Sequence, residues 1–421
     1  MAIIIGSGAG GATVAKELAL KNIPVTIIEK GPYIESSDSF KYYDSNPEGM
    51  DLLKTTCVGG STSVSMGNAV RSLEEDLKEL GIDISSEYDE LEKELDIHIM
   101  DEEHFGKGTN VFINSAKELN LEVSKMPKFI IDEDCQICGK CAFGCPTDAK
   151  WTSKKYIDIA CENGAKLLTN TEATQIITDN ANKVVGVKVL KTINKEGKEE
   201  KTEETIELDE DGLVILAAGG INSAIILENS GINAGNSLFM DGFVTMGGVL
   251  KDVNFDREVQ MNALVKGEHF ILSPHFSTFI TQQINILNDK IKDTVENKDI
   301  LSIMIKIPDE GIGSVKEGIV RKENTLQDIQ YLAEGCAVAG AILENAGVDP
   351  NTLISTIYRG AHPGGTAPIG EVVDNNLKTE INGFYVCDAS VIPKAPGAPP
   401  ILLILALAKR LSKHLIKNIE C

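Results

Sequence analysis

The fold of this chain is decided by its first stretch, Ala2-Ile3-Ile4-Ile5-Gly6-Ser7-Gly8-Ala9-Gly10-Gly11. A short apolar run leads directly into a glycine turn, and the residues from Ala12 to Leu20 have the composition of a helix. A second apolar run, Val25 to Ile28, ends at Glu29. This order of a strand, a glycine turn, a helix, a second strand and an acidic residue, all within about thirty residues, is typical of a dinucleotide-binding βαβ unit.

Each part of this pattern has a physical role. Gly6 permits the tight turn, Gly8 lets the backbone approach a pyrophosphate, and Gly11 lets the helix pack close to the strand. The helix N-terminus, with Ala9 and Gly10, offers free N–H groups and a partial positive charge to the phosphates. The Glu29 carboxylate can accept hydrogen bonds from a ribose diol. The alternative is a glycine-rich turn without a ligand.

Size and charge narrow the class of protein. The 421 residues suffice for two domains, or for one large α/β domain with an insertion. The formal net charge of −23 predicts an acidic surface that repels nucleic acid and anionic lipid. The longest apolar run, Ile401 to Ala408, is well below the roughly 20 residues that a membrane span requires.

We expect a cytoplasmic protein, because the first strand begins too early to leave room for a signal peptide. The nine cysteines are then interpreted as thiols or metal ligands and not as disulfides.

The order of predicted elements indicates an α/β chain whose cofactor domain is discontinuous. We assign residues 1–75, 151–239 and 355–421 to that domain, 76–150 to a helical, cysteine-rich segment, and 240–354 to an inserted α+β substrate domain. Helices are expected within 73–95 and over 111–119. Strands are expected over 166–168, 173–177, 184–189 and 213–216, with a polar hairpin tip over 194–205.

Five motifs occur in a fixed order along the chain. They are Gly6 to Gly11 with Glu29, Val58-Gly59-Gly60-Ser61-Thr62 with Asn68, Ala217-Ala218-Gly219-Gly220 with Ser223, His362-Pro363-Gly364-Gly365-Thr366, and Gly383 to Ser390 followed by Pro399-Pro400. In this order they resemble the glucose–methanol–choline (GMC) family of FAD-dependent oxidoreductases. The resemblance is weakest from Met240 to Lys322.

The resemblance implies FAD and a Rossmann-like domain. Gly59, Gly60 and Ser61 would lie against the isoalloxazine ring, Asp388 near the pyrophosphate or ribityl chain, and Ala173 near the adenine. Further contacts implied in the same way are at Lys30, Asn68, Ala218, Gly219, Ala389 and Pro399. Each of these positions also has a purely structural interpretation, which is a plain turn at Gly59-Gly60, a helix N-cap at Asp388 and a core strand residue at Ala173.

The resemblance assigns the chemistry to His362. A histidine at this position in the family removes the hydroxyl proton while hydride passes to the flavin. An unperturbed imidazole pKa near 6.5 suits that task. The alternative is a hydrogen-bonded structural histidine. The family's second His or Asn aligns with Pro399, which cannot take a proton, so another donor is needed or the chemistry differs. His275 and Asn262 are candidates for that donor.

A second constellation is Cys135-x-x-Cys138-x-x-Cys141-x-x-x-Cys145-Pro146, which has the spacing of a bacterial ferredoxin run. The run has three interpretations: an iron–sulfur cluster such as 4Fe–4S, a zinc ion in a four-cysteine site, or simple packing of the thiols. A cluster could take another ligand from Cys57, Cys161, Cys336 or Cys387. Some GMC-like relatives of the long-chain alcohol oxidases carry a similar segment followed by a lysine, here Lys150.

These patterns favour an FAD-dependent dehydrogenase that oxidises a CH–OH group of a small molecule, with electrons leaving to a ferredoxin-like carrier. A flavin and iron–sulfur reductase of a C=C or C=O bond is the second hypothesis, since it accounts for Pro399 and the cysteine spacing. An electron-transfer module of a larger complex is the third.

Overall fold

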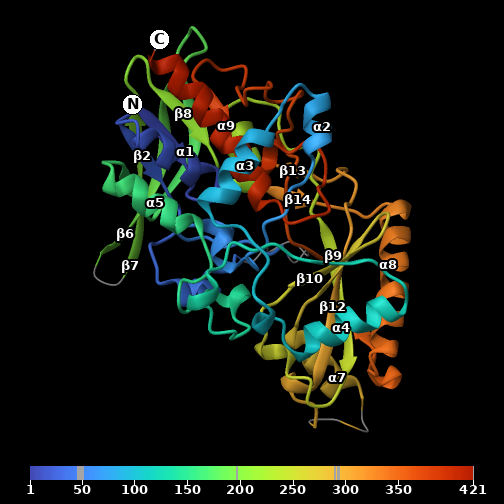
Figure 1. The fold of residues 1–421 in the computed structure, drawn as a ribbon. Coiled ribbons are helices and arrows are strands. Elements are labelled where there is room, and N and C mark those ends of the chain that lie inside the picture. The colour runs from blue at the N-terminus through green and yellow to red at the C-terminus, as the bar shows by residue number, and fades with distance from the viewer. Residues whose placement is uncertain (45–51, 196–197, 289–290, 292–293, 421) are drawn as a thin grey trace.

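The computed structural model describes residues 1–44, 52–195, 198–288, 291 and 294–420. The chain forms two lobes around two separate sheets (Figure 1). One lobe contains both chain termini and the parallel sheet, and the other contains the yellow and orange strands with α4, α7 and α8.

The parallel sheet has the strand order β17–β8–β1–β2–β4. Its members are the short apolar runs of the sequence: β1 (Ala2–Ile5), β2 (Val25–Ile28), β4 (Lys166–Leu168), β8 (Leu213–Leu216) and β17 (Phe384–Val386). The four residues of β1 are buried, as expected for a central parallel strand covered on both faces. This sheet confirms the predicted Rossmann-like fold class.

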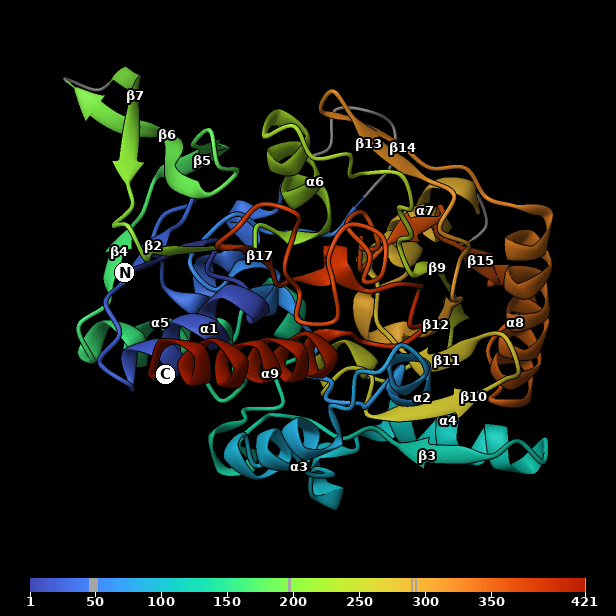
Figure 2. The same cartoon turned by 90° about the horizontal axis from the view of Figure 1, so that it is seen from above.

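Helices from distant parts of the chain cover this sheet. The helix that follows the glycine turn, α1 (Ala9–Ala19), packs against α5 (Ser153–Glu162) and the long C-terminal α9 (Ile401–Glu420). Figure 2 shows these three helices side by side. The two ends of the chain are therefore parts of one core.

The second sheet is antiparallel, with the order β15–β9–β12–β11–β10–β3 and β16 also paired to β9. Its strands are β3 (Val123–Lys125), β9 (Gly242–Val249), β10 (Ala263–Lys266), β11 (Ile271–Pro274), β12 (Ile300–Lys306), β15 (Ile354–Ser355) and β16 (Arg359–Gly360). Helices α4 (Lys107–Glu118), α7 (Thr278–Leu287) and α8 (Leu326–Asn345) pack on it.

Two of these strands come from outside the segment 240–354 that we assigned to the substrate domain. They are β3 and β16, which are three and two residues long. A strand this short shows no alternation of polar and apolar residues, so its pairing cannot be recognised from the sequence.

The remaining elements are a three-stranded sheet, a small hairpin and three helices. They are β5 (Thr171–Thr178), β6 (Val184–Lys195) and β7 (Lys198–Glu207); β13 (Ser314–Lys316) and β14 (Ile319–Arg321); and α2 (Glu74–Glu79), α3 (Ser85–Glu94) and α6 (Gly219–Asn229). The helices predicted within 73–95 and over 111–119 are confirmed as α2, α3 and part of α4.

The segment 194–205 belongs to a hairpin, as predicted, but the length predicted for the polar tip is wrong. Most of this segment is β7, paired antiparallel to β6, and 196–197 lie outside the described residues. The segment is rich in Lys and Glu, which suggests a loop, but charged side chains are compatible with an exposed strand whose backbone is hydrogen-bonded to a neighbour. In Figure 2 this hairpin extends away from the body of the protein.

Close backbone packing under the glycine turn gives a stability prediction. A Cβ atom on Gly10 would lie 1.7 Å from the carbonyl oxygen of Cys387, whereas a Cβ on Gly8 would meet nothing within 4 Å. We expect Gly10→Ala to lower the free energy of unfolding by about 3 kcal/mol or more, because neither backbone segment can move aside. Gly8→Ala is the matched control and should change it by less than about 1 kcal/mol.

Urea unfolding of the two variants measures the difference. Equal stability of Gly10→Ala and Gly8→Ala would contradict this account of the packing.

Candidate active site

A cavity of about 910 Å³ lies between the lobes. Its wall includes the glycine turn after β1, the ends of β2 and β8, and side chains from the antiparallel sheet such as Phe243, Met304 and Lys306. The carboxyl ends of parallel strands next to helix N-termini are where α/β folds bind ligands. The antiparallel sheet closes the opposite side of the same cavity.

The glycine turn presents its backbone to this cavity. Gly6 has a φ of 99°, and a Cβ there would lie 2.2 Å from the carbonyl oxygen of Ala217. Gly8 precedes the first residue of α1, so the unpaired N–H groups of the first helical turn lie at the cavity wall. The position of Gly8 is open on its Cβ side, which suits an anionic group bound against the backbone.

Glu29 lies at the end of β2 and is buried, with its carboxylate in a fixed position. One oxygen accepts hydrogen bonds from the Ser7 N–H at 3.1 Å and the Ser7 hydroxyl at 2.5 Å, and the other accepts from the Gly31 N–H at 2.7 Å. Burial raises the pKa of Glu29, and these hydrogen bonds oppose that shift. Glu29 also lines the cavity.

Asp388 connects two helix N-termini. One of its oxygens accepts from the Ser390 N–H at 2.8 Å and caps the 3-10 turn Ala389–Val391. The other accepts from the Gly219 N–H at 2.8 Å and the Ser223 hydroxyl at 2.6 Å. The N-cap alternative from the sequence is thus found in the structure, and the same residue also lies on the cavity wall.

Most of the residues predicted to bind the cofactor are brought together. Those on the cavity wall are Gly6, Gly8, Ala9, Gly10, Glu29, Lys30, Gly60, Ser61, Asn68, Ala173, Ala218, Gly219, Asp388, Ala389 and Pro399. Gly11 and Gly59 lie outside the wall. A Cβ on Gly11 would lie 2.1 Å from the Gly6 carbonyl oxygen, which agrees with its predicted packing role, and the Gly59 N–H donates to the Ser7 hydroxyl at 3.1 Å.

His362 follows β16 and lines the cavity next to two ionisable side chains. Its Nδ1 atom is 2.9 Å from Oδ2 of Asp241 and 2.9 Å from Nζ of Lys306. No residue that the structure describes is hydrogen-bonded to Nε2, and 22% of the side chain stays exposed. Burial and the nearby Lys306 charge hold the pKa of His362 well below its usual value.

Sequence reasoning missed both partners of His362. Asp241 directly precedes β9 and is fully buried, and its second oxygen accepts from the Gly397 N–H at 2.9 Å. Burial raises the pKa of Asp241 to about 7 and lowers that of Lys306 to about 8. One signal was available: Lys306 is the single charged residue in the run Ile300-Leu301-Ser302-Ile303-Met304-Ile305-Lys306, and a lysine ending such a strand is rarely buried without a partner.

The donors suggested to replace Pro399 have other partners. Asn262 donates to the carbonyl oxygen of His104 at 2.9 Å and does not line the cavity, so that prediction is wrong. His275 does line the cavity, but its Nδ1 lies 3.2 Å from the Thr245 hydroxyl. Burial lowers the pKa of His275 to about 4, so this imidazole is neutral.

A buried ion pair holds the backbone on either side of Asp241. Asp309 and Lys322 are 2.9 Å apart, and both side chains are fully buried. Asp309 also accepts from the N–H groups of Met240 and Gly242, which flank Asp241. The pair therefore positions the backbone that carries Asp241.

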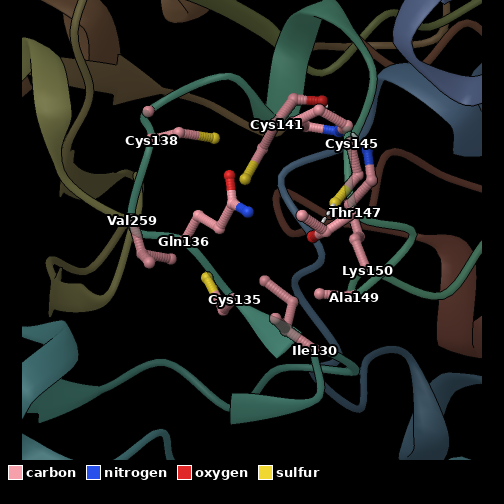
Figure 3. A pocket seen from close by; sticks show the side chains of 12 residues that line it. Ile130, Cys135, Gln136, Cys138, Cys141, Cys145, Thr147, Ala149, Lys150 and Val259 are labelled. Carbon is pink, nitrogen blue, oxygen red and sulfur yellow. Dashed lines mark hydrogen bonds between the residues drawn. The ribbon is translucent and has the colours of Figure 1, made fainter. Parts of the chain in front are cut away.

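The four cysteines of the ferredoxin-like run line one separate small cavity of about 20 Å³ (Figure 3). None of Cys57, Cys161, Cys336 and Cys387 lines it. Its wall shares Gly139 with the large cavity, which is also lined by Ala142 and Phe143 from the same loop. Among the described residues, no group of three or more His, Cys, Asp or Glu side chains is arranged to hold a metal ion, so neither zinc nor an iron–sulfur cluster gains support from this arrangement.

Two buried lysines lie between this small cavity and the large one. The Lys150 ammonium donates to the carbonyl oxygens of Ser63, Ser65 and Cys141 at 2.7–2.9 Å. Lys128 donates to the carbonyl oxygens of Met66 and Gln260 and to the side chain of Asn68. Both side chains are almost fully buried. Burial lowers the pKa of Lys128 to about 7 and that of Lys150 to about 8, and it raises the pKa of the Cys141 thiol, so a negative charge at Cys141 would favour the charged form of both lysines.

None of the helices in the described part of the chain is long and apolar enough to cross a membrane.

The Asp309–Lys322 pair gives a second stability prediction. Lys322→Met should lower the free energy of unfolding by about 3–5 kcal/mol, because it leaves the Asp309 carboxylate buried without its cation. Lys41→Met removes the cation of an exposed pair with Asp38, and we expect a change of about 1 kcal/mol or less. Thermal or urea unfolding of the two variants measures these changes. If Lys322→Met destabilised the protein as little as Lys41→Met, the buried pair would not stabilise the fold.

Comparisons with known proteins agree with this architecture. Models of the N-terminal and C-terminal parts of the GMC oxidoreductases match residues 2–252 and 318–408. An uncharacterized protein of Methanocaldococcus jannaschii is 35% identical over 98% of this chain and 99% of its own length. The long-chain-alcohol oxidase FAO4B of Arabidopsis thaliana is 24% identical over 100% of this chain and 67% of its own length.

Two solved structures share the fold at low sequence identity. Pyridoxine 4-oxidase from Mesorbium loti has a TM-score of 0.74 and 14% identity, with 99% of each chain covered. Formate oxidase from Aspergillus oryzae has a TM-score of 0.75 and 15% identity, with 100% of this chain and 98% of that chain covered. From the two family models together with the parallel and antiparallel sheets around one cavity, the chain belongs to the GMC oxidoreductase family.

Proposed function

We propose that this chain is an FAD-dependent oxidoreductase that acts on the CH–OH group of a small organic molecule, with His362 as the base. The observation that carries the proposal is a single cavity with the glycine turn and Glu29 on one wall and His362 on another. In this proposal, one end of the cavity binds the nucleotide and the other end carries out the reaction.

The residues of the cavity fit FAD. The open position at Gly8 and the free N–H groups of α1 would bind the pyrophosphate, and the fixed Glu29 carboxylate would accept from a ribose diol. Gly60 and Ser61, after the left-handed residue Gly59, would lie against the ring system. When bound, FAD supplies a two-electron acceptor for hydride.

His362 suits the removal of a hydroxyl proton. Its Nδ1 is engaged by Asp241 and Lys306, so Nε2 is the nitrogen that can reach a ligand in the cavity. The depressed pKa keeps the imidazole neutral at physiological pH, and a general base must be neutral before it accepts a proton. The names of the similar oxidases, which act on long-chain alcohols, pyridoxine and formate, support a substrate with oxygen at the reacting carbon.

We further propose that electrons leave through an iron–sulfur cluster at the cysteine cavity, to a ferredoxin-like carrier, so that the protein works as a dehydrogenase. The support is the position of four cysteines around one small cavity that borders the large one at Gly139. Two buried ammonium groups, of Lys128 and Lys150, would balance the negative charge of cluster-bound thiolates. Electrons entering by the same route would drive the second candidate function, reduction of a C=C or C=O bond.

The role of His362 can be tested with a conservative variant. His362→Asn should retain FAD but reduce it about 10²–10⁴-fold more slowly with substrate, because a positioned general base contributes about that factor. Anaerobic stopped-flow absorbance with a panel of primary and secondary alcohols measures the rate. His414→Asn, at a partly exposed position of α9 outside the cavity wall, is the control and should behave as wild type. Wild-type rates in His362→Asn would refute the assignment.

The cysteine cavity can be tested by metal content. Protein purified without oxygen should contain about four iron atoms per chain, and the double variant Cys138→Ser/Cys141→Ser should contain almost none. Cys336→Ser, on α8 outside this cavity, should retain the iron. An iron content in the wild type no higher than in the double variant would contradict the proposal.

A further inference from the structure

Pro399 leaves the site without the second proton-handling side chain that the resemblance implies, and the structure places a lysine at the catalytic candidate instead. Lys306 is the last residue of β12, a strand buried along its whole length. Its Nζ atom is 2.9 Å from Nδ1 of His362 and lines the cavity. It comes from the antiparallel sheet, far in sequence from the family motifs that surround His362.

We propose that Lys306 and His362 form a two-residue proton relay, in which His362 carries the substrate proton and Lys306 stores it, while Asp241 orients the ring. The relay rests on the proposed function. Because Lys306 acts through His362, it is a positioning residue in this scheme and needs no contact with the substrate.

The geometry at Nδ1 creates two alternative states. An imidazole nitrogen can either accept one hydrogen bond through its lone pair or donate its own N–H. With Lys306 as an ammonium group, Lys306 donates to Nδ1, and the ring proton lies on Nε2. With Lys306 as a neutral amine, Nδ1–H donates to the Asp241 carboxylate at 2.9 Å, and Nε2 becomes a free base facing the cavity. The protonation state of Lys306 therefore selects the tautomer of His362.

The proton affinities of the two groups favour transfer to the lysine. A proton held by His362 alone would make an imidazolium ion, which burial and the neighbouring Lys306 disfavour. The lysine has a pKa of about 8, near working pH, and its charge is compensated by Asp241 and Asp309. The proton can therefore be stored on Lys306 without leaving an uncompensated charge on the ring.

The hydroxyl proton of the substrate moves to Nε2 of His362. The Nδ1 proton breaks its hydrogen bond to Asp241 and moves to the neutral amine of Lys306, which lies 2.9 Å from the same nitrogen, and the C–H hydrogen leaves with its electron pair to the FAD of the proposed function. The products are a carbonyl compound, reduced cofactor and the Lys306 ammonium ion. Run backwards, the same relay supplies the proton for reduction of a carbonyl group.

The pH dependence follows from the groups around Lys306. Asp241 and Asp309 raise its pKa, burial lowers it by more, and the neighbouring His362 and His275 are neutral. Arg359 lies at the same cavity wall. The reactive form contains the neutral amine, so the rate of cofactor reduction should rise with pH through about 8.

The tautomer can be measured without any substrate. In histidine-¹⁵N-labelled holoprotein, with the His362 signals assigned by His362→Asn, the ring proton should move from Nε2 to Nδ1 as the pH rises through about 8. Lys306→Arg should keep the proton on Nε2 at every pH, since arginine does not deprotonate. Lys306→Met should keep it on Nδ1. Lys251→Met, which removes a lysine paired with Asp299 outside the cavity wall, should leave the wild-type transition unchanged.

Kinetics separate failure of the relay from failure of the function. Lys306→Arg should slow anaerobic cofactor reduction about 10²-fold and abolish its rise with pH. If His362→Asn is slow but both Lys306 variants reduce the cofactor at wild-type rates, or if Lys306→Met shows the wild-type tautomer transition, the relay is wrong and the proposed function stands. If His362→Asn itself reacts as fast as wild type, the proposed function fails as well.

Discussion

Direct packing of backbone on backbone at the carboxyl ends of β8 and β17 is the constraint on which the rest of the structure depends. The glycine turn and α1 approach the carbonyl oxygens of Ala217 and Cys387 so closely that no Cβ atom fits between them. This contact sets the direction of α1 and so places its free N–H groups at the cavity. It also brings the C-terminal strand β17, and with it Asp388, next to the N-terminal turn.

The second wall of the cavity depends on buried charges that balance one another. Asp241, Lys306, Asp309 and Lys322 are two acids and two bases without access to water, and each negative group has a positive neighbour. Ionised groups persist in such surroundings only when they are paired and hydrogen-bonded. As a consequence, the imidazole of His362 is neutral. Its Nδ1 atom is fixed by Asp241 and Lys306, which leaves Nε2 for a ligand in the large cavity.

The two walls differ in how far the sequence alone predicts them. The nucleotide side is local: Gly6 to Gly11 and Glu29 lie within one βαβ unit, and each glycine is required by the geometry of that unit. The reactive side is assembled by tertiary contacts. Asp241, Lys306 and His362 come from three separate segments, and no spacing relates them. His362 is predicted through its motif, whereas the place of Lys306 at the end of an apolar run indicates a buried lysine without identifying its partners. The position of β3 in the antiparallel sheet escaped prediction for the same reason, since three residues carry no pattern of their own.

The roles of the glycine turn, Asp388 and His362 all require that the large cavity binds a flavin. The most direct measurement is the absorption spectrum of gently purified protein, followed by titration of any colourless fraction with FAD. We predict a yellow protein with flavin absorption bands and one FAD bound per chain, with Asp388 and the glycine turn in contact with it. Protein that is isolated colourless and does not bind added FAD would contradict the account.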